Sequence, residues 1–139
     1  GQIAFAVKSF VLPNSQGKYN TDLAIEVALK HQASGTIHKV FLAFEAGDRI
    51  ELLKNLKPGH YLAIEYSTYR DTGSPSFHTY TIEPVLKIEV RPGQTILFPR
   101  LVNMSALFPI GGLSYLSDKD YWHKLMMNDA KNQTLNEEI

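Results

Sequence analysis

The stretch Leu56-Lys57-Pro58-Gly59-His60-Tyr61 decides the fold of this 139-residue chain. Proline fixes φ at about −65° and glycine accepts a positive φ, so Pro58-Gly59 predicts a type II turn. Beyond the turn, apolar residues recur at every second position from Leu62 to Tyr66, which indicates a strand with one buried face. A turn that reverses the chain directly into an aromatic-led strand is typical of an all-β protein.

The same alternation of apolar and polar residues fills most of the chain before residue 103. The alternating runs are short, and turn signals separate them roughly every 8–12 residues, as in sandwiches and barrels. Pro84 has no N–H for a ladder and is expected to separate two strands. Strands are predicted near residues 3–7, 23–29, 36–44, 50–52, 61–69, 77–82, 85–90 and 95–102.

The pattern changes after these strands. The apolar but broken run Phe108–Leu113 predicts a packed loop. Ser117 suits the N-cap of a helix with Asp118 and Asp120 in its first turn, where negative charge is stabilising. We expect this helix to run from about residue 118 to residue 131, followed by a frayed polar tail.

Composition excludes several classes of protein. Fourteen basic and fourteen acidic residues give no net charge, so the basic footprint of a nucleic-acid binder is missing. The absence of cysteine removes disulfides, thiolate nucleophiles and zinc–thiolate sites. No apolar run reaches the roughly 18–20 residues of a membrane helix, so no transmembrane segment is expected. We also expect no cofactor.

Two stretches resemble a known family. Ile50–Ile64 is similar to the apolar–x–apolar–x–x–Leu–x–Pro–Gly–x–Tyr pattern of carboxypeptidase-regulatory-like domains, which belong to the transthyretin-like (prealbumin-like) sandwiches. Thr81–Leu97 looks like the closing strands of these domains around the turn Arg91-Pro92-Gly93-Gln94. The family's Asp-Gly-x-Phe motif is only echoed by Gly47–Ile50.

The resemblance implies a seven- to eight-stranded antiparallel Greek-key β-sandwich with one C-terminal α-helix. Residues 1–104 would form the sandwich, and residues 105–139 the packed loop and helix of the same domain. Such domains usually act as accessory modules, so we expect a non-catalytic structural or protein-interaction module. Its expected location is periplasmic, outer-envelope or secreted, and a lipoprotein without its anchor is one form of this expectation.

The family also contains an enzyme, the hydroxyisourate hydrolase, whose site is completed by a Tyr-Arg-Gly-Ser terminus. Here the comparable run, Tyr69–Ser74, is interrupted and lies in mid-chain. The enzymatic role is therefore not carried over. A small hydrolase using His60 and His78 is kept as a remote alternative. None of the five histidines has the spacing of metal ligands, so a metal site is not expected.

Aromatic residues flank the polar loop of residues 70–76, and they form the first candidate contact surface. A protein partner or a sugar are the two ligands considered for it, because aromatic rings anchor partner chains and stack on sugars. The favoured alternative is that Tyr66 and Tyr80 simply pack as a cross-strand pair. The candidate residues are Tyr66, Tyr69, Arg70, Phe77, His78 and Tyr80.

The second candidate surface lies in the C-terminal part of the chain. Phe108, Trp122 and Met126 hold more apolar area than a solvated appendage should. The favoured interpretation is that the helix docks on one sheet and closes the core. The alternative is that these residues contact a partner or a second copy of the chain.

Overall fold

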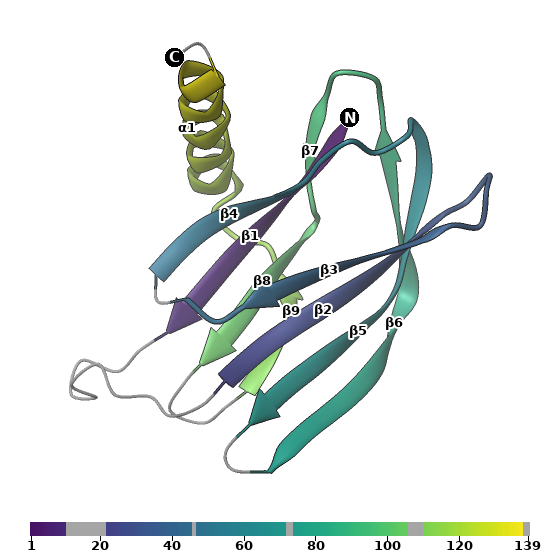
Figure 1. The fold of residues 1–139 in the computed structure, drawn as a ribbon, viewed down its shortest axis with the longest axis vertical. Coiled ribbons are helices and arrows are strands. Elements are labelled where there is room, and N and C mark those ends of the chain that lie inside the picture. The colour runs from purple at the N-terminus through teal and green to yellow at the C-terminus, as the bar shows by residue number, and fades with distance from the viewer. Residues whose placement is uncertain (11–21, 46, 72–73, 106–109, 138–139) are drawn as a thin grey trace.

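A computed structural model describes residues 1–10, 22–45, 47–71, 74–105 and 110–137 of the chain. These residues form a β-sandwich with one helix (Figure 1). The elements are β1 (Gln2–Phe10), β2 (Asp22–His31), β3 (Ile37–Ala43), β4 (Gly47–Leu53), β5 (Gly59–Asp71), β6 (Pro75–Val90), β7 (Thr95–Leu97), β8 (Arg100–Ser105), β9 (Ile110–Tyr115) and α1 (Lys119–Glu137).

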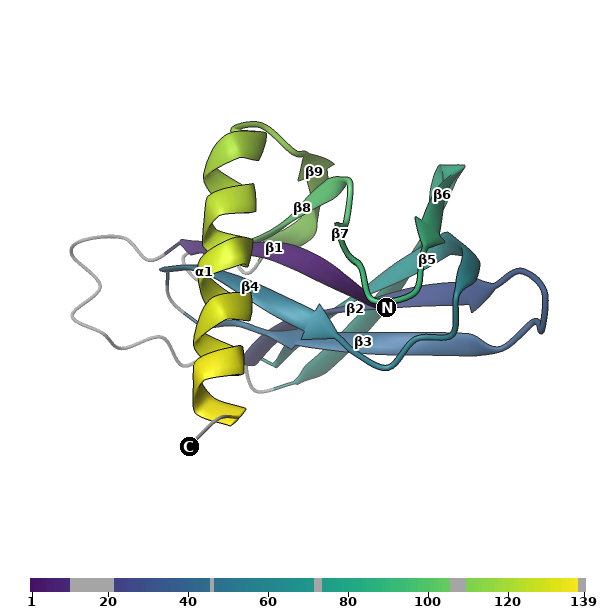
Figure 2. The ribbon, with the colours of Figure 1, turned by 90° about the horizontal axis from the view of Figure 1, so that it is seen from above.

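The strands divide into two sheets, seen edge-on in Figure 2. Sheet A has the order β4-β1-β8-β9, with β7 also paired to β1, and sheet B has the order β3-β2-β5-β6. The chain crosses between the sheets after β1, β3, β4 and β6. The predicted all-β sandwich with a C-terminal helix is confirmed. The described residues form nine strands, and sheet A is mixed because β1 runs parallel to β7 and β8.

Alternation along the strands builds the core between the sheets. Ile3, Phe5 and Val7 point inward from β1 and are fully buried. The ring of Phe5 packs on that of Phe98, with centroids 4.8 Å apart. Tyr61, the first aromatic residue after Pro58-Gly59, is fully buried, and so is Ala63. The buried face in this part of β5 is therefore not the predicted one of Leu62 and Ile64, because the bulge between Ala63 and Glu65 shifts the alternation.

The first turns of α1 cover the outer face of sheet A. Trp122 lies in a second apolar cluster with Ala6 and Leu101, and Met126 is buried as well. The prediction that the helix docks on its own domain is therefore confirmed, and Trp122 and Met126 are not available as an exposed contact surface. Phe108, the third residue of that surface, lies outside the described residues.

Three sequence-based boundaries are wrong. The helix continues to Glu137, because neither glycine nor proline interrupts residues 132–137. Its cap is Asp118, whose carbonyl accepts a hydrogen bond from the Trp122 N–H at 3.2 Å, and not Ser117. Residues 110–115 form β9 and not a loop, because they pair antiparallel with β8 from Ser105–Ile110 to Arg100–Tyr115.

Pro84 does not divide two strands as predicted. β6 runs through it as one sixteen-residue edge strand. Ala63 pairs with Leu86 and Glu65 pairs with Thr81, so residues 82–85 of β6 lie opposite Ile64 alone. This bulge lets Pro84 sit in the strand without a ladder hydrogen bond.

Candidate functional site

The six candidate residues around the 70–76 loop lie on the hairpin of β5 and β6. Its two strands pair in register from Glu65–Thr81 to Asp71–Pro75, so residues 70, 71, 75 and 76 of the predicted loop belong to the strands, and residues 72 and 73 lie outside the described residues. β-Branched and aromatic residues fill both strands, and such residues favour the pleated conformation. All six side chains are thus placed by one ladder.

The ladder separates the six residues onto two faces of sheet B. Tyr66 pairs with Tyr80 on the face that looks into the sandwich, because Tyr66 is also in register with the core residue Val27. Tyr69 pairs with Phe77 on the opposite, outer face. The four aromatics therefore do not form the single contact surface predicted from the sequence. Counting the odd separation of Tyr66 and Tyr69 along a period-two strand would have revealed the division.

On the inner face, the two tyrosines stack on each other. The Tyr66 and Tyr80 centroids are 5.2 Å apart and their planes differ by 24°. Burial, and to a lesser degree the neighbouring Tyr80, raise the pKa of Tyr66 above its ordinary value. Each ring has one face covered by the other, as the packing interpretation predicted. They do not form the pair of coplanar, open rings that a sugar platform requires.

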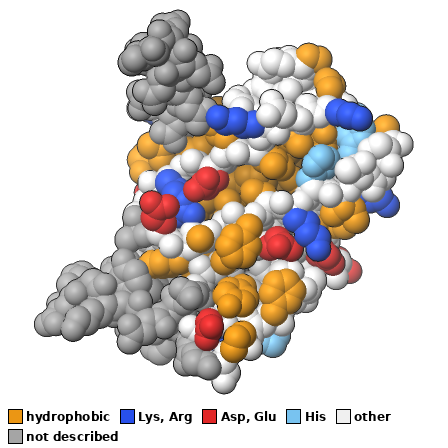
Figure 3. Space-filling model, viewed as in Figure 1, with side chains coloured by type: hydrophobic (Ala, Val, Ile, Leu, Met, Phe, Trp, Pro, Cys, Tyr) orange, Lys and Arg blue, Asp and Glu red, His pale blue; other side chains and the backbone are white. Residues whose placement is uncertain are grey.

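On the outer face, the aromatic pair continues an apolar row across the whole sheet. Ala43, Ala24, Tyr69 and Phe77 are successive neighbours on β3, β2, β5 and β6. Phe77 is 58% exposed, and Phe41 beside the row is 60% exposed. Figure 3 shows hydrophobic side chains on this side of the molecule with charged ones between them. Unlike the outer face of sheet A, this face is not covered by α1.

The polar candidates do not assemble a catalytic set. His78 hydrogen-bonds Ser76 on its own strand, with Nε2 3.1 Å from Oγ. His78 pairs with Thr68 of β5, whereas His60 lies eight residues earlier on the same strand. At about 3.3 Å per residue, the two histidines are roughly 26 Å apart. The structure does not bring together the pair on which the hydrolase alternative depends.

A different histidine, His31, has a defined environment that the sequence did not reveal. It is buried at the end of β2. Its Nε2 donates to the Pro58 carbonyl at 3.2 Å, since a carbonyl only accepts. Its Nδ1 accepts from the Ser34 N–H at 3.3 Å and lies 2.7 Å from Ser34 Oγ. His31 therefore ties the β2–β3 turn to the turn before β5.

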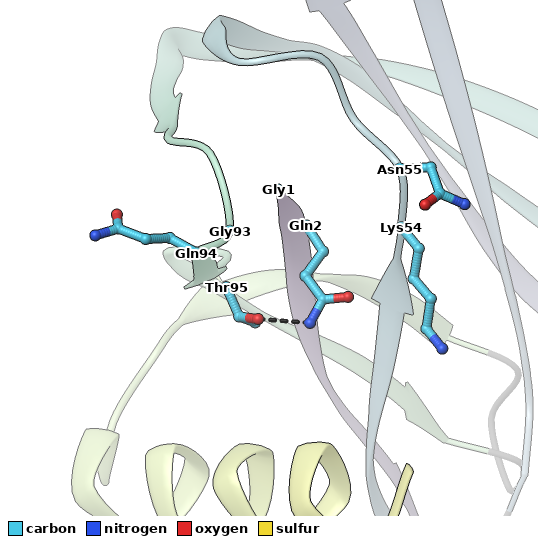
Figure 4. Close-up of a pocket in the computed structure, with 7 residues that line it drawn as sticks. All are labelled: Gly1, Gln2, Lys54, Asn55, Gly93, Gln94 and Thr95. Carbon is cyan, nitrogen blue, oxygen red and sulfur yellow. Dashed lines mark hydrogen bonds between the residues drawn. The ribbon is translucent and has the colours of Figure 1, made fainter. Parts of the chain in front are cut away.

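Two surface hollows lie away from the hairpin. The first is about 230 Å³ and is lined by Gly1, Gln2, Lys54, Asn55, Gly93, Gln94 and Thr95 (Figure 4). In it, Gln2 Nε2 donates to Thr95 Oγ1 at 2.5 Å, and no lining residue is a histidine, aspartate or glutamate. The second, about 490 Å³, is lined by residues 115–121 at the start of α1.

Neither a metal-binding cluster nor a membrane-spanning helix occurs in the described part of the chain. These residues contain no group of three or more histidines, aspartates or glutamates that could hold a metal ion. Among them, too, no helix has the length and hydropathy of a membrane span.

The free edge of β6 differs from the other sheet edges. Its segment from Pro75 to Thr81 contains no lysine, arginine, aspartate or glutamate, and every residue except the half-buried Ser76 is exposed. Unpaired N–H and C=O groups along an edge are a template for another strand, and charged residues normally protect them. The β6 segment lacks that protection.

The remaining edges are short, charged or covered. β3 carries Lys39 as the third of its seven residues, with Nζ 3.8 Å from Glu26 Oε1. β4 carries Asp48, Arg49 and Glu51 and is contacted by α1. β7 has three residues, and β9 contains two consecutive glycines, which weaken strand pairing. Among the described edge strands, the Pro75–Thr81 segment of β6 is the longest uncharged stretch.

Comparisons with family models, with curated proteins and with solved structures found no match to this chain.

Proposed function

We propose that this chain is a non-catalytic protein-interaction module that binds an extended segment of a partner protein along β6. The observation that carries the proposal is the exposed, uncharged edge from Pro75 to Thr81. In strand addition, main-chain hydrogen bonds to an open edge give affinity, and the flanking side chains give specificity.

The side chains beside this edge support the same role. Phe77 on the outer face is 58% exposed and Tyr80 on the inner face is 47% exposed. An added strand would cover part of both, because it would extend sheet B beyond its last strand. Removing this apolar surface from water favours association by about 25 cal/mol per Å².

The family resemblance and the predicted location are proposals of the same kind. Transthyretin-like domains usually act as accessory or interaction modules, and the Pro58-Gly59 turn and the two-sheet fold support that assignment. A secreted or envelope location, including a lipoprotein, suits an accessory module of this type.

The proposal is tested by selecting random twelve-residue peptides displayed on phage against the whole chain. An edge-blocked variant, His78→Lys with Thr81→Lys, places one lysine on each face of the free edge. The matched control, Gln32→Lys with Ala33→Lys, adds the same charge in the exposed β2–β3 turn. We expect selected peptides to bind the wild type and the control, and to bind the edge-blocked variant at least about tenfold more weakly.

Amide hydrogen exchange locates the bound peptide. Strand addition should slow exchange within residues 75–81 and leave β3 and β4 unchanged. Peptides that bind the edge-blocked variant as well as the wild type, or that protect another region, would contradict the proposed function.

A further inference from the structure

The structure limits the length of strand that β6 can accept. At one end, residues 82–85 bulge out of the ladder opposite Ile64, and Pro84 within them has no N–H to donate. At the other end, the paired part of the strand begins at Pro75. The regular edge is therefore seven residues long, which corresponds to about 23 Å of strand.

The bulge also divides the strand by charge. Residues 75–81 contain no lysine, arginine, aspartate or glutamate, whereas Glu83, Lys87 and Glu89 follow within the second part. The Arg91 guanidinium hydrogen-bonds Glu89 at 3.0 Å and lowers the pKa of that carboxyl. A charged partner strand could pair with opposite charges on residues 83–89, but not on residues 75–81.

The register fixes which side chains a new strand would meet. Phe77, Thr79 and Thr81 lie on the outer face, and Ser76, His78 and Tyr80 on the inner face. Thr79 already bonds Ser67 within the sheet, with the two hydroxyl oxygens 2.9 Å apart. Phe77 and Tyr80 are thus the large exposed groups, three residues apart and on opposite faces.

From this arrangement we propose the chemistry of the partner segment, on the basis of the proposed function. It is an extended stretch of about seven residues without charge or proline. It carries β-branched or aromatic side chains at two positions three residues apart, one opposite Phe77 and one opposite Tyr80. Cross-strand pairs of aromatic and β-branched residues are the favourable ones, and an unpaired charge beside an apolar edge is not compensated.

The test starts from a synthetic peptide identified by the selection and measures its affinity by fluorescence anisotropy. Truncation to the seven residues that pair with 75–81 should preserve affinity within about threefold. A lysine or proline in the centre of the seven should weaken binding about tenfold or more. The same substitution outside the seven should have little effect, and it serves as the matched control.

Double-mutant cycles identify the two anchor positions. Phe77→Ser should couple to one apolar position of the peptide, and Tyr80→Ser to a second position three residues away. Each coupling should be about two- to fivefold in Kd. Thr36→Ser, an exposed change outside the hairpin, should couple to neither.

The outcomes separate this inference from the function on which it rests. If selected peptides bind at the β6 edge but carry central charges, need more than about nine residues, or show no coupling three residues apart, the partner chemistry is wrong and the function stands. If no peptide depends on the edge, the function itself fails. If sedimentation equilibrium shows a dimer that the edge-blocked variant abolishes, the occupant is a second copy and the inference is overturned.

Discussion

Replacing Gly59 by alanine tests how the turn before β5 is built. Gly59 has a φ of +135°, which side-chain-bearing residues rarely adopt, and such strain costs about 1–3 kcal/mol. A Cβ there would also lie 2.9 Å from His31 Nε2. The ring is held at both nitrogens, by Pro58 and Ser34.

The clash adds to the strain. Displacing the ring weakens two hydrogen bonds, each contributing about 0.5–1.5 kcal/mol. Gly59→Ala should therefore lower the free energy of unfolding by about 2–6 kcal/mol, the sum of the strain and the two bonds. The measurement is urea unfolding followed by the fluorescence of Trp122, the single tryptophan.

Two other glycines provide matched controls. Gly35 and Gly93 have φ values of +75° and +70°, and no atom lies within 4 Å of a Cβ built at either. Their alanine variants should cost only the left-handed strain, about 1–2 kcal/mol. In a His31→Ala background, the cost of Gly59→Ala should fall toward the same value. If Gly59→Ala costs no more than Gly35→Ala, or if its cost is unchanged without His31, the packing argument is refuted.

Three further variants test the core and the helix. Tyr61→Phe removes the hydroxyl that donates to the Lys57 carbonyl at 2.6 Å, and should cost about 0.5–1.5 kcal/mol in urea unfolding. Burial raises the pKa of Tyr61, so the free energy of unfolding of the wild type should fall as pH rises above about 10. That of Tyr61→Phe should fall less over the same pH range, and an equal fall would contradict this. Trp122→Ala should lower the free energy of unfolding, measured by thermal unfolding, by about 3–5 kcal/mol. Met127→Ala, at an exposed position of the same helix, should change it by less than about 0.5 kcal/mol. Equal effects of the two variants would mean that α1 is not docked. The buried hydroxyl of Ser9 has no hydrogen-bond partner among the described residues, so Ser9→Ala should leave the melting temperature unchanged or raise it, and a clear drop would reveal a missing partner.

Much of the fold was predictable because it depends on local pattern. Alternation placed the inward residues of β1 and β2, and Pro58-Gly59 placed the start of β5. The pattern from Trp122 to Met126 placed the docked part of α1. These signals succeed because burial of one face imposes its period on the sequence.

Less of the candidate site was predictable. The aromatic residues of the hairpin were found, but their division between two faces needed the register of β5 and β6. The anchoring of His31 joins residues 27 positions apart in the chain, and no local pattern marks such a contact. The pairing of β9 with β8 was hidden by Gly111 and Gly112, because consecutive glycines are typical of a loop and weaken strand pairing.

The sequence by itself determined an uncharged, aromatic and β-branched run from Pro75 to Thr81, and the turns that bound the strands. Only the tertiary structure decided that this run lies at an edge. Sheet order fixes which strand has no neighbour, and it results from pairings between segments far apart in the chain. The same seven residues inside a sheet would be ordinary core sequence, whereas at the edge of β6 their backbone groups are free to bind another strand.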